Sequence, residues 1–249
     1  MAGYSEAFAA CYDRLIGEVD YGERADFYLN QFQRFKDRCE LVLDLACGTG
    51  SLCRELAARG LEVIGVDGSQ EMLMQAREKC QDCQPPVLLL CQEMEALDLY
   101  GTVSLAVCMQ DSLNHLAGEK ALAAVFGRLR YFVEPGGLFI FDMNTPYKHR
   151  EVLGENTFVL EEDDLYCVWQ NGYDPQEGAV DIQLDFFQQQ ADGRFVRSSE
   201  CFRDYSYPTQ RVEALLTQAQ FDLLEVQGDY TGQPPTATEE RLVYIARRR

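Results

Sequence analysis

A short apolar run followed by two closely spaced glycines constrains the fold of this chain more than any other feature. Residues 41–46 form the run, with Asp44 inside it, and Gly48 and Gly50 follow before a helical pattern begins at Ser51. This order predicts a strand, a tight turn and a helix, which together are the first unit of a parallel α/β sheet. Glycines let a ligand approach the backbone, and the first helical turn has free N–H groups. The unit therefore predicts a nucleotide-type pocket.

The spacing around the glycines discriminates between the candidate nucleotides. A dinucleotide-binding turn needs a third glycine three residues after the second, and Cys53 stands at that position. A nicotinamide oxidoreductase is therefore a weaker alternative. No lysine follows the glycines, which counts against a phosphate-binding loop. Asp44 can instead pair with an ammonium group, such as that of a methionine moiety.

These residues resemble the first motif of the class I S-adenosylmethionine-dependent methyltransferases, an apolar strand with an acid and then G-x-G. Residues 63–73 resemble the second motif, a short strand that ends at Asp67 and a helix that Ser69 can cap. A carboxylate at that strand end can accept hydrogen bonds from both hydroxyls of a ribose. The alternative is that Asp67 serves only as a cap. The resemblance implies S-adenosylmethionine as the cofactor.

Further strands and helices alternate along the chain, which is typical of a parallel, doubly wound sheet. Apolar segments predict strands at 86–91, which we expect to be buried, and at 103–108, 138–142, 221–227 and 241–246. With these segments, the resemblance implies a Rossmann-like α/β methyltransferase fold, with seven strands in the order 3-2-1-4-5-7-6.

The segment between the predicted strands at 138–142 and 221–227 has a different pattern of apolar residues. Alternating apolar residues predict antiparallel strands at 157–160, 165–169, 179–186 and 195–205, with turns at 171–172 and 192–193. We expect a small inserted sheet that covers the substrate and presents Trp169 to it. The alternative is an interface between subunits, so an oligomer through the inserted sheet stays open.

Two amphipathic helices are predicted before the first strand, at residues 4–16 and 24–38, with a loop between them. The resemblance implies that such helices cover the cofactor and contribute a tyrosine, for which Tyr12 and Tyr21 are the candidates. The alternative for each ring is packing between the helices. We therefore expect N-terminal lid helices in residues 1–38, a cofactor-binding core in 39–149 and 208–249, and an inserted antiparallel β lid in 150–207.

The family also uses an acid just beyond the third strand, which accepts a hydrogen bond from the adenine amino group. Glu93 has that position, Met94 supplies the next backbone N–H, and Glu95 is the alternative acid. The full set of cofactor-binding residues that the resemblance implies is Tyr12, Tyr21, Asp44, Ala46, Cys47, Gly48, Gly50, Asp67, Gly68, Met72, Glu93, Met94 and Gln110.

The polar end of the fourth strand is predicted to face the transferred methyl group, because strand carboxyl ends face the ligand crevice in open α/β sheets. Asp111 and His115 are the candidate catalytic residues there, with His115 as a general base or, alternatively, a packing residue. No Asn-Pro-Pro-Tyr motif is present, which disfavours methylation of the amino group of adenine or glutamine. No Pro-Cys nucleophile is present, which disfavours a reaction through a cysteine. Asn144, Tyr147 and His149 follow the fifth strand as candidate substrate contacts, alongside Trp169.

Charge and cysteine content limit the partners. The 249 residues include 22 Lys and Arg against 41 Asp and Glu, a net charge of -19, which disfavours nucleic acid. The ten cysteines read as small buried residues of a reducing compartment. Cys80 and Cys83 have a metal-like spacing, but no second Cys or His pair accompanies them, so no metal is expected. Without a long apolar run, the protein is expected to be cytoplasmic and not to use a membrane.

The most direct interpretation is a methyltransferase that moves a methyl group from S-adenosylmethionine to the nitrogen or oxygen of a small molecule. An acidic chain suits an amine as acceptor. The alternatives are a methyltransferase for RNA or protein, and a non-catalytic module that binds S-adenosylmethionine.

Overall fold

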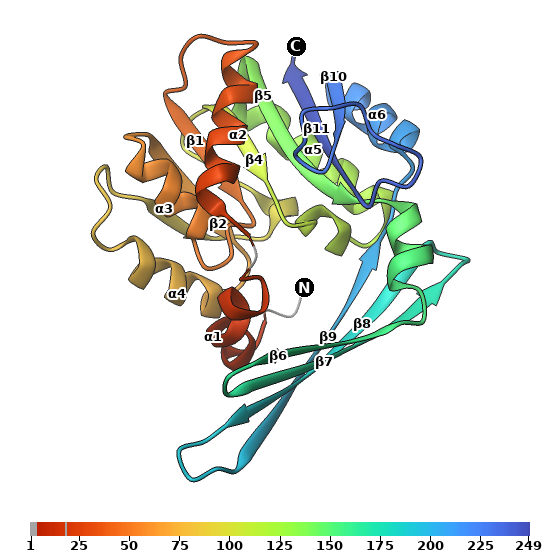
Figure 1. Cartoon of the computed structure of the whole chain (residues 1–249). Coiled ribbons are helices and arrows are strands. Elements are labelled where there is room, and N and C mark those ends of the chain that lie inside the picture. The colour runs from red at the N-terminus through yellow and green to blue at the C-terminus, as the bar shows by residue number, and fades with distance from the viewer. Residues whose placement is uncertain (1–3, 18) are drawn as a thin grey trace.

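A seven-stranded sheet covered by helices on both faces forms the body of the molecule, and a separate four-stranded sheet extends from it (Figure 1). The computed structural model describes residues 4–17 and 19–249. Residues 1–3 and Glu18, which belong to the predicted lid segment 1–38, lie outside the described residues. No helix in the described ranges has the length and apolar character needed to cross a membrane.

The large sheet has the order β10-β11-β5-β4-β1-β2-β3, which confirms the predicted order once the four inserted strands are left out of the count. The first five strands of the chain run parallel, and β11 pairs antiparallel with both β5 and β10. The strands of this sheet are β1 Leu41–Leu45, β2 Glu62–Asp67, β3 Leu88–Cys91, β4 Val103–Cys108, β5 Val133–Asn144, β10 Phe221–Gly228 and β11 Arg241–Arg248.

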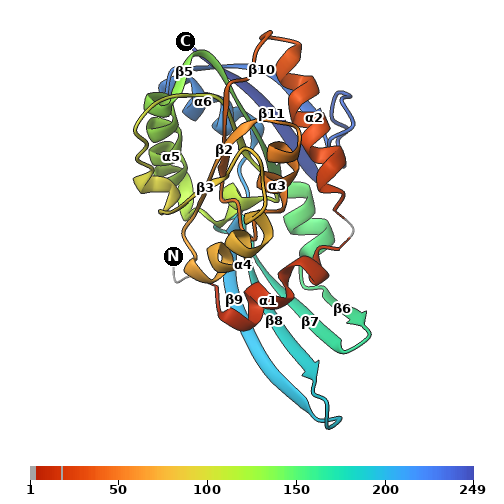
Figure 2. The ribbon, with the colours of Figure 1, turned by 90° about the vertical axis from the view of Figure 1, so that its left-hand side faces the viewer.

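The two faces of this sheet are covered by different helices (Figure 2). On strand β5, Phe139 and Phe141 pack into one apolar cluster with α5 and α6, whereas Leu138 and Ile140 pack into a second cluster with α2 and α3. Successive side chains of a strand point to opposite faces, so a run that is apolar at every position is buried on both sides. The helices are α1 Glu6–Leu15, α2 Tyr21–Gln33, α3 Ser51–Ala58, α4 Gln70–Cys80, α5 Gly118–Phe132 and α6 Thr209–Gln218, with short helical turns η1 Met94–Ala96, η2 Ser112–His115 and η3 Lys148–Leu153.

The inserted sheet has the order β6-β7-β8-β9 and is antiparallel throughout. Its strands are β6 Thr157–Glu162, β7 Leu165–Asp174, β8 Ala179–Gln189 and β9 Phe195–Tyr205. One face carries Ile182, Leu184 and Phe186, which pack with Phe8 and Cys11 of α1. Helix α1 therefore lies between the inserted sheet and the large sheet (Figure 1).

Three local predictions were wrong. Helix α2 spans Tyr21–Gln33 and not 24–38, because the Asp20 carboxylate accepts a hydrogen bond from the Glu23 N–H (2.9 Å) and starts the helix earlier. Strand β3 is not buried: it lies at the sheet edge, where Leu88 is half exposed. Cys91 and Cys201 are exposed as well, unlike the buried cysteines that we expected.

The predicted turn at 171–172 is also wrong, whereas the turn at 192–193 is confirmed. Asn171 and Gly172 lie inside β7, and the chain turns after Asp174, whose carboxylate accepts hydrogen bonds from the next backbone N–H groups, including that of Gln176 (2.9 Å). Gly193 has a φ of +82° in the turn that joins β8 to β9.

Candidate functional site

A cavity of about 600 Å³ lies at the carboxyl ends of the parallel strands, between the large sheet, α1 and the inserted sheet. Most residues that the sequence analysis named line it: Tyr12, Ala46, Gly48, Asp67, Gly68, Met72, Glu93, Met94, Gln110, Asp111, His115, Asn144 and Trp169. The others stand outside its wall: Tyr21, Asp44, Cys47, Gly50, Tyr147 and His149. The cavity therefore joins loops from five parallel strands to the inner face of the inserted sheet.

Asp67 joins the ends of β1 and β2. Its two carboxylate oxygens accept hydrogen bonds from the N–H groups of Gly48 and Ser69, each at 2.8 Å. Burial raises the pKa of Asp67, and these two backbone hydrogen bonds oppose the shift without cancelling it. A carboxylate oxygen has about two lone pairs, so each oxygen can accept a further hydrogen bond from a ligand hydroxyl in the cavity.

Asp44 is placed differently from the prediction. It is fully buried in β1 behind the glycine turn, where its Oδ2 accepts from the Cys53 thiol (3.1 Å), and its Oδ1 has no hydrogen-bond partner among the described residues. Burial raises the pKa of Asp44 to about 7. Asp44 therefore contacts Cys53 of α3 and does not line the cavity, and its pairing with a ligand ammonium stays a prediction.

Gly50 and Cys47 support the glycine turn from behind. A Cβ on Gly50 would lie 2.9 Å from the Cβ of Ala76 in α4, so the turn packs tightly on that helix. Cys47 is nearly buried and does not line the cavity. Both residues shape the turn rather than its ligand-facing surface.

The end of the cavity beside β3 is lined by Gly68, Glu93 and Met94. Glu93 precedes η1, and a Cβ on Gly68 would lie 3.1 Å from its Oε2, so the glycine makes space for this carboxylate. Met94 is buried beside it. Glu95, the alternative acid, is exposed and does not line the cavity.

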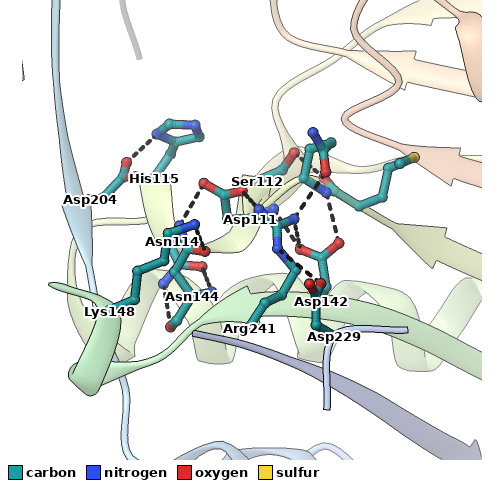
Figure 3. Close-up of polar contacts among 12 residues, drawn as sticks. Asp111, Ser112, Asn114, His115, Asp142, Asn144, Lys148, Asp204, Asp229 and Arg241 are labelled. Atoms are coloured by element: carbon teal, nitrogen blue, oxygen red, sulfur yellow. Dashed lines mark hydrogen bonds and ion pairs between the residues drawn. The ribbon is translucent and has the colours of Figure 1, made fainter. Parts of the chain in front are cut away.

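Asp111 forms an ion pair that the sequence did not predict (Figure 3). Its Oδ1 lies 2.8 Å from the Arg241 guanidinium, and its Oδ2 accepts from the Asn144 side chain (2.9 Å). Burial raises the pKa of Asp111, but Arg241, with Lys148 further away, lowers it more, so the group is held ionised. The antiparallel register that sets Arg241 opposite Asn144 brings the pair together.

His115 lies in a second polar group on the same wall (Figure 3). Its Nδ1 is 2.6 Å from Oδ1 of Asp204 on β9, and its Nε2 is 3.2 Å from the Tyr4 hydroxyl. Burial lowers the pKa of His115, but the Asp204 carboxylate raises it more, so its pKa is above the ordinary value. Phe202 contacts the ring edge-on, with centroids 5.1 Å apart. Sequence reasoning missed Asp204 and Tyr4, which lie in distant segments.

Of the remaining predicted residues, only Tyr12 lines the cavity. His149 is completely buried in η3, and burial lowers its pKa, so it is a neutral packing residue. Tyr147 directly precedes η3 and does not line the cavity. Tyr21 packs in the apolar cluster of α2, whereas Tyr12 lines the cavity. In residues 4–17 and 19–249 no three His, Cys, Asp or Glu side chains are grouped so that they could hold a metal ion.

Known proteins similar to this chain are methyltransferases. A family model described as a methyltransferase domain matches residues 42–137. The Bacillus subtilis protein YqeM, provisionally named a methyltransferase, is 30% identical over 98% of this chain and 96% of its own. The crystal structure of a S-adenosylmethionine-dependent methyltransferase from Clostridium acetobutylicum has a TM-score of 0.88 and 30% identity, and covers 97% of this chain and 98% of that one.

A further relative, similar over a shorter segment of this chain, has a name that states its substrate. The dTDP-3-amino-3,6-dideoxy-alpha-D-glucopyranose N,N-dimethyltransferase of Streptomyces fradiae is 32% identical over 57% of this chain and 54% of its own length.

Proposed function

Since the chain belongs to the class I S-adenosylmethionine-dependent methyltransferases, we propose that it methylates the nitrogen of a small-molecule amine. The observation that carries the amine is the contact of His115 with Asp204 on one side and Tyr4 on the other, at the cavity wall. S-adenosylmethionine supplies an electrophilic methyl group on a sulfonium. The acceptor must supply a nitrogen lone pair, so a protonated amine has to lose a proton first.

The residues at the β1, β2 and β3 ends fit this cofactor. In the proposal, the Asp67 carboxylate accepts the ribose hydroxyls with the lone pairs that Gly48 and Ser69 leave open. Glu93 accepts from the adenine amino group, and the backbone of Met94 donates to the ring. The close approach of Glu93 to Gly68 supports this assignment, because a side chain at Gly68 would fill the space.

Tyr12 and Met72 complete the apolar lining, with the backbone of Ala46 and Gly48 at the methionine end. Gln110 lies between the two ends of the cavity. Asp44 then acts from behind the turn, as a buried acid that supports the strand.

His115 is the proposed base. Its Nε2 takes a proton from the acceptor nitrogen, which replaces the Tyr4 hydroxyl as the partner of Nε2, and Asp204 beside Nδ1 stabilises the imidazolium that results. The nitrogen lone pair then forms the new N–C bond as the C–S bond breaks, and the electron pair of that bond goes to sulfur. Asp111, held ionised by Arg241, orients the acceptor rather than removing its proton. Asn144 and Trp169 line the acceptor side.

The composition and the relatives support a small acceptor. The Streptomyces fradiae relative is named for an amino sugar nucleotide, so an amine is the acceptor of a similar chain. The cavity is covered by α1 and by the inserted sheet. Two of the basic side chains on its wall, Arg203 and Arg241, are paired with acids of the chain itself. A net charge of -19 also disfavours RNA as the substrate.

The test begins with calorimetric titration of the purified protein with S-adenosylmethionine, S-adenosylhomocysteine and NAD. We expect binding of the two adenosyl compounds and none of NAD. A screen of small amines and matched alcohols then tests the acceptor, with His115→Gln as the variant that removes the base. Turnover of alcohols alone, or an amine activity that His115→Gln leaves intact at neutral pH, would refute the proposed chemistry.

A further inference from the structure

Two consecutive residues on the cavity wall have an unusual backbone. Gln110 and Asp111, which follow β4 after Met109, have φ angles of +56° and +49°. Left-handed backbone is unfavourable for residues with a Cβ. The short side chains of Asn and Asp can offset this cost by hydrogen-bonding locally, but the longer side chain of glutamine is not favoured in this conformation. Such residues persist where the surrounding structure enforces them, and they concentrate at functional sites. Something in this structure must therefore hold the pair.

The holding group is the carboxylate of Asp142 on the neighbouring strand β5. Its Oδ2 accepts from the Gln110 N–H at 2.9 Å, and its Oδ1 accepts from the Asp111 N–H at 2.6 Å. The Asp142 side chain is completely buried, and the carboxylate lies directly beneath the turn (Figure 3). One carboxylate thus binds the two successive backbone N–H groups of this turn.

Arg241 and Tyr230 fix the carboxylate in turn. The Arg241 guanidinium donates to Oδ1 of Asp142 (3.2 Å), to Oε1 of Gln110 (3.0 Å) and to Oδ1 of Asp111 (2.8 Å). The Tyr230 hydroxyl donates to Oδ2 of Asp142. The backbone of the pair is therefore held by Asp142, and its two side chains are held by Arg241, which itself binds Asp142.

We propose that Asp142 is a positioning residue for methyl transfer: it holds the Gln110–Asp111 turn left-handed so that Asp111 and the following turn η2, with His115, face the acceptor. The inference rests on the proposed function. If the turn relaxed to a right-handed backbone, the Asp111 side chain would leave the wall, and the start of η2 at Ser112 would shift with it. Small displacements of this kind cost rate, because methyl transfer depends on alignment of the reacting atoms.

The test compares Asp142→Asn with Asp229→Asn. Asparagine keeps the size of Asp142, but its NH₂ group cannot accept from a backbone N–H. Asp229 is the matched control, because its carboxylate also lies near Arg241 (3.9 Å) yet bonds neither N–H of the turn. We expect kcat for the amine to fall by up to about 100-fold in Asp142→Asn, with a much smaller change in the affinity for S-adenosylhomocysteine. Asp229→Asn should retain kcat.

A second readout needs no acceptor. In the wild-type protein, the amide protons of Gln110 and Asp111 should be shifted downfield in NMR spectra and protected from exchange, as expected for bonds to a carboxylate. Asp142→Asn keeps one accepting oxygen, so at least one of the two amide protons should lose both properties, and Asp229→Asn should preserve them at both. If Asp142→Asn does not fold, Tyr230→Phe removes one partner of the same carboxylate and should weaken both properties and kcat in parallel.

The outcomes separate the two proposals. Unchanged amide signals in Asp142→Asn would overturn the positioning role, and so would lost amide signals with an unchanged kcat, since the turn would then be purely structural. If no amine is methylated, the proposed function fails, while the amide readout still supports or overturns the role of Asp142 in holding the turn.

Discussion

Replacement of Gly50 by alanine should destabilise the protein more than any other single Gly→Ala change in the glycine turn region. Gly50 has a φ of +75°, which alanine adopts only with strain. The added Cβ would also lie 2.9 Å from the Cβ and 3.1 Å from the Cα of Ala76 in α4. Since these atoms belong to the backbone or are fixed to it, the neighbour cannot rotate away, and the turn or α4 must move.

The two costs can be estimated separately. Left-handed backbone in a residue with a Cβ costs about 1–2 kcal/mol, and inserting a methyl group into a packed region costs about 1–3 kcal/mol. Gly50→Ala should therefore lower the free energy of unfolding by roughly 3 kcal/mol. For a chain of this size, that corresponds to a fall in Tm of roughly 10 °C.

Two other glycines isolate each cost. Gly60 has a φ of +82°, and a Cβ there would meet nothing within 4 Å, so Gly60→Ala measures the backbone strain alone. Gly65 has no such φ, and its Cβ would lie 2.8 Å from Cys53 Sγ and 2.8 Å from Leu89 Cδ2, both ends of side chains that can shift. Gly65→Ala therefore measures the crowding alone.

Thermal and urea unfolding of the three variants, followed by circular dichroism, is the assay. Gly50→Ala should cost about as much as Gly60→Ala and Gly65→Ala together, or more, because Ala76 is less able to yield than Cys53 and Leu89. It should also weaken binding of S-adenosylhomocysteine, since the turn moves. A Gly50→Ala protein as stable as Gly60→Ala would refute the close packing of the turn on α4.

Three further predictions concern the cavity. Asp67→Ala should weaken the binding of S-adenosylmethionine by about 1–3 kcal/mol, because charge-assisted hydrogen bonds are lost. Calorimetric titration of a variant whose circular dichroism spectrum shows an intact fold measures this change. An unchanged Kd would contradict the ribose assignment. Asp204 holds the pKa of His115 above its ordinary value. The kcat/KM for the amine should therefore rise with pH as His115 loses its proton, and Asp204→Asn should move this rise to lower pH. A pH profile that does not move would contradict His115 as the base. The Lys79 ammonium donates to Asp13 of α1 (2.6 Å), so Lys79→Met should speed dissociation of S-adenosylhomocysteine by about two- to fivefold, measured by stopped-flow; an unchanged rate would show that this contact does not restrain α1.

The glycine turn and Asp67 could be predicted from the sequence because each depends on a local pattern, whereas the order of the large sheet was implied by the resemblance to the methyltransferases. Ser69 caps α4 as expected, with its Oγ accepting from the Met72 N–H at 3.2 Å. The alternation of apolar residues in 157–205 likewise predicted the inserted sheet, whose strands pair with their neighbours in the chain. Local spacing carries this information directly.

Other parts of the site could not be predicted, because they depend on contacts between distant segments. Arg241 reaches Asp111 only through the register of β11 against β5, and Asp204 reaches His115 only because β9 passes beside η2. No spacing along the chain encodes either contact. His149 was predicted to face the crevice because it follows the fifth strand, but it lies in η3, where its ring is completely buried.

The two ends of the cavity are therefore lined by different segments of the chain, and this difference affects acceptor specificity. In the proposed assignment, the cofactor end is built mainly from residues 46–94, which lie within the segment 42–137 matched by the methyltransferase family model, and Tyr12 of α1 is the contribution from outside that segment. The contacts of His115 come from Tyr4 and Asp204, both outside that segment. Substitutions in α1 and β9 can thus reshape the acceptor end without touching Asp67 or the glycine turn. Acceptor specificity should follow the N-terminal segment and the inserted sheet. Affinity for the cofactor should follow mainly the parallel strands, with Tyr12 and the contact of Lys79 with Asp13 as the contribution of α1.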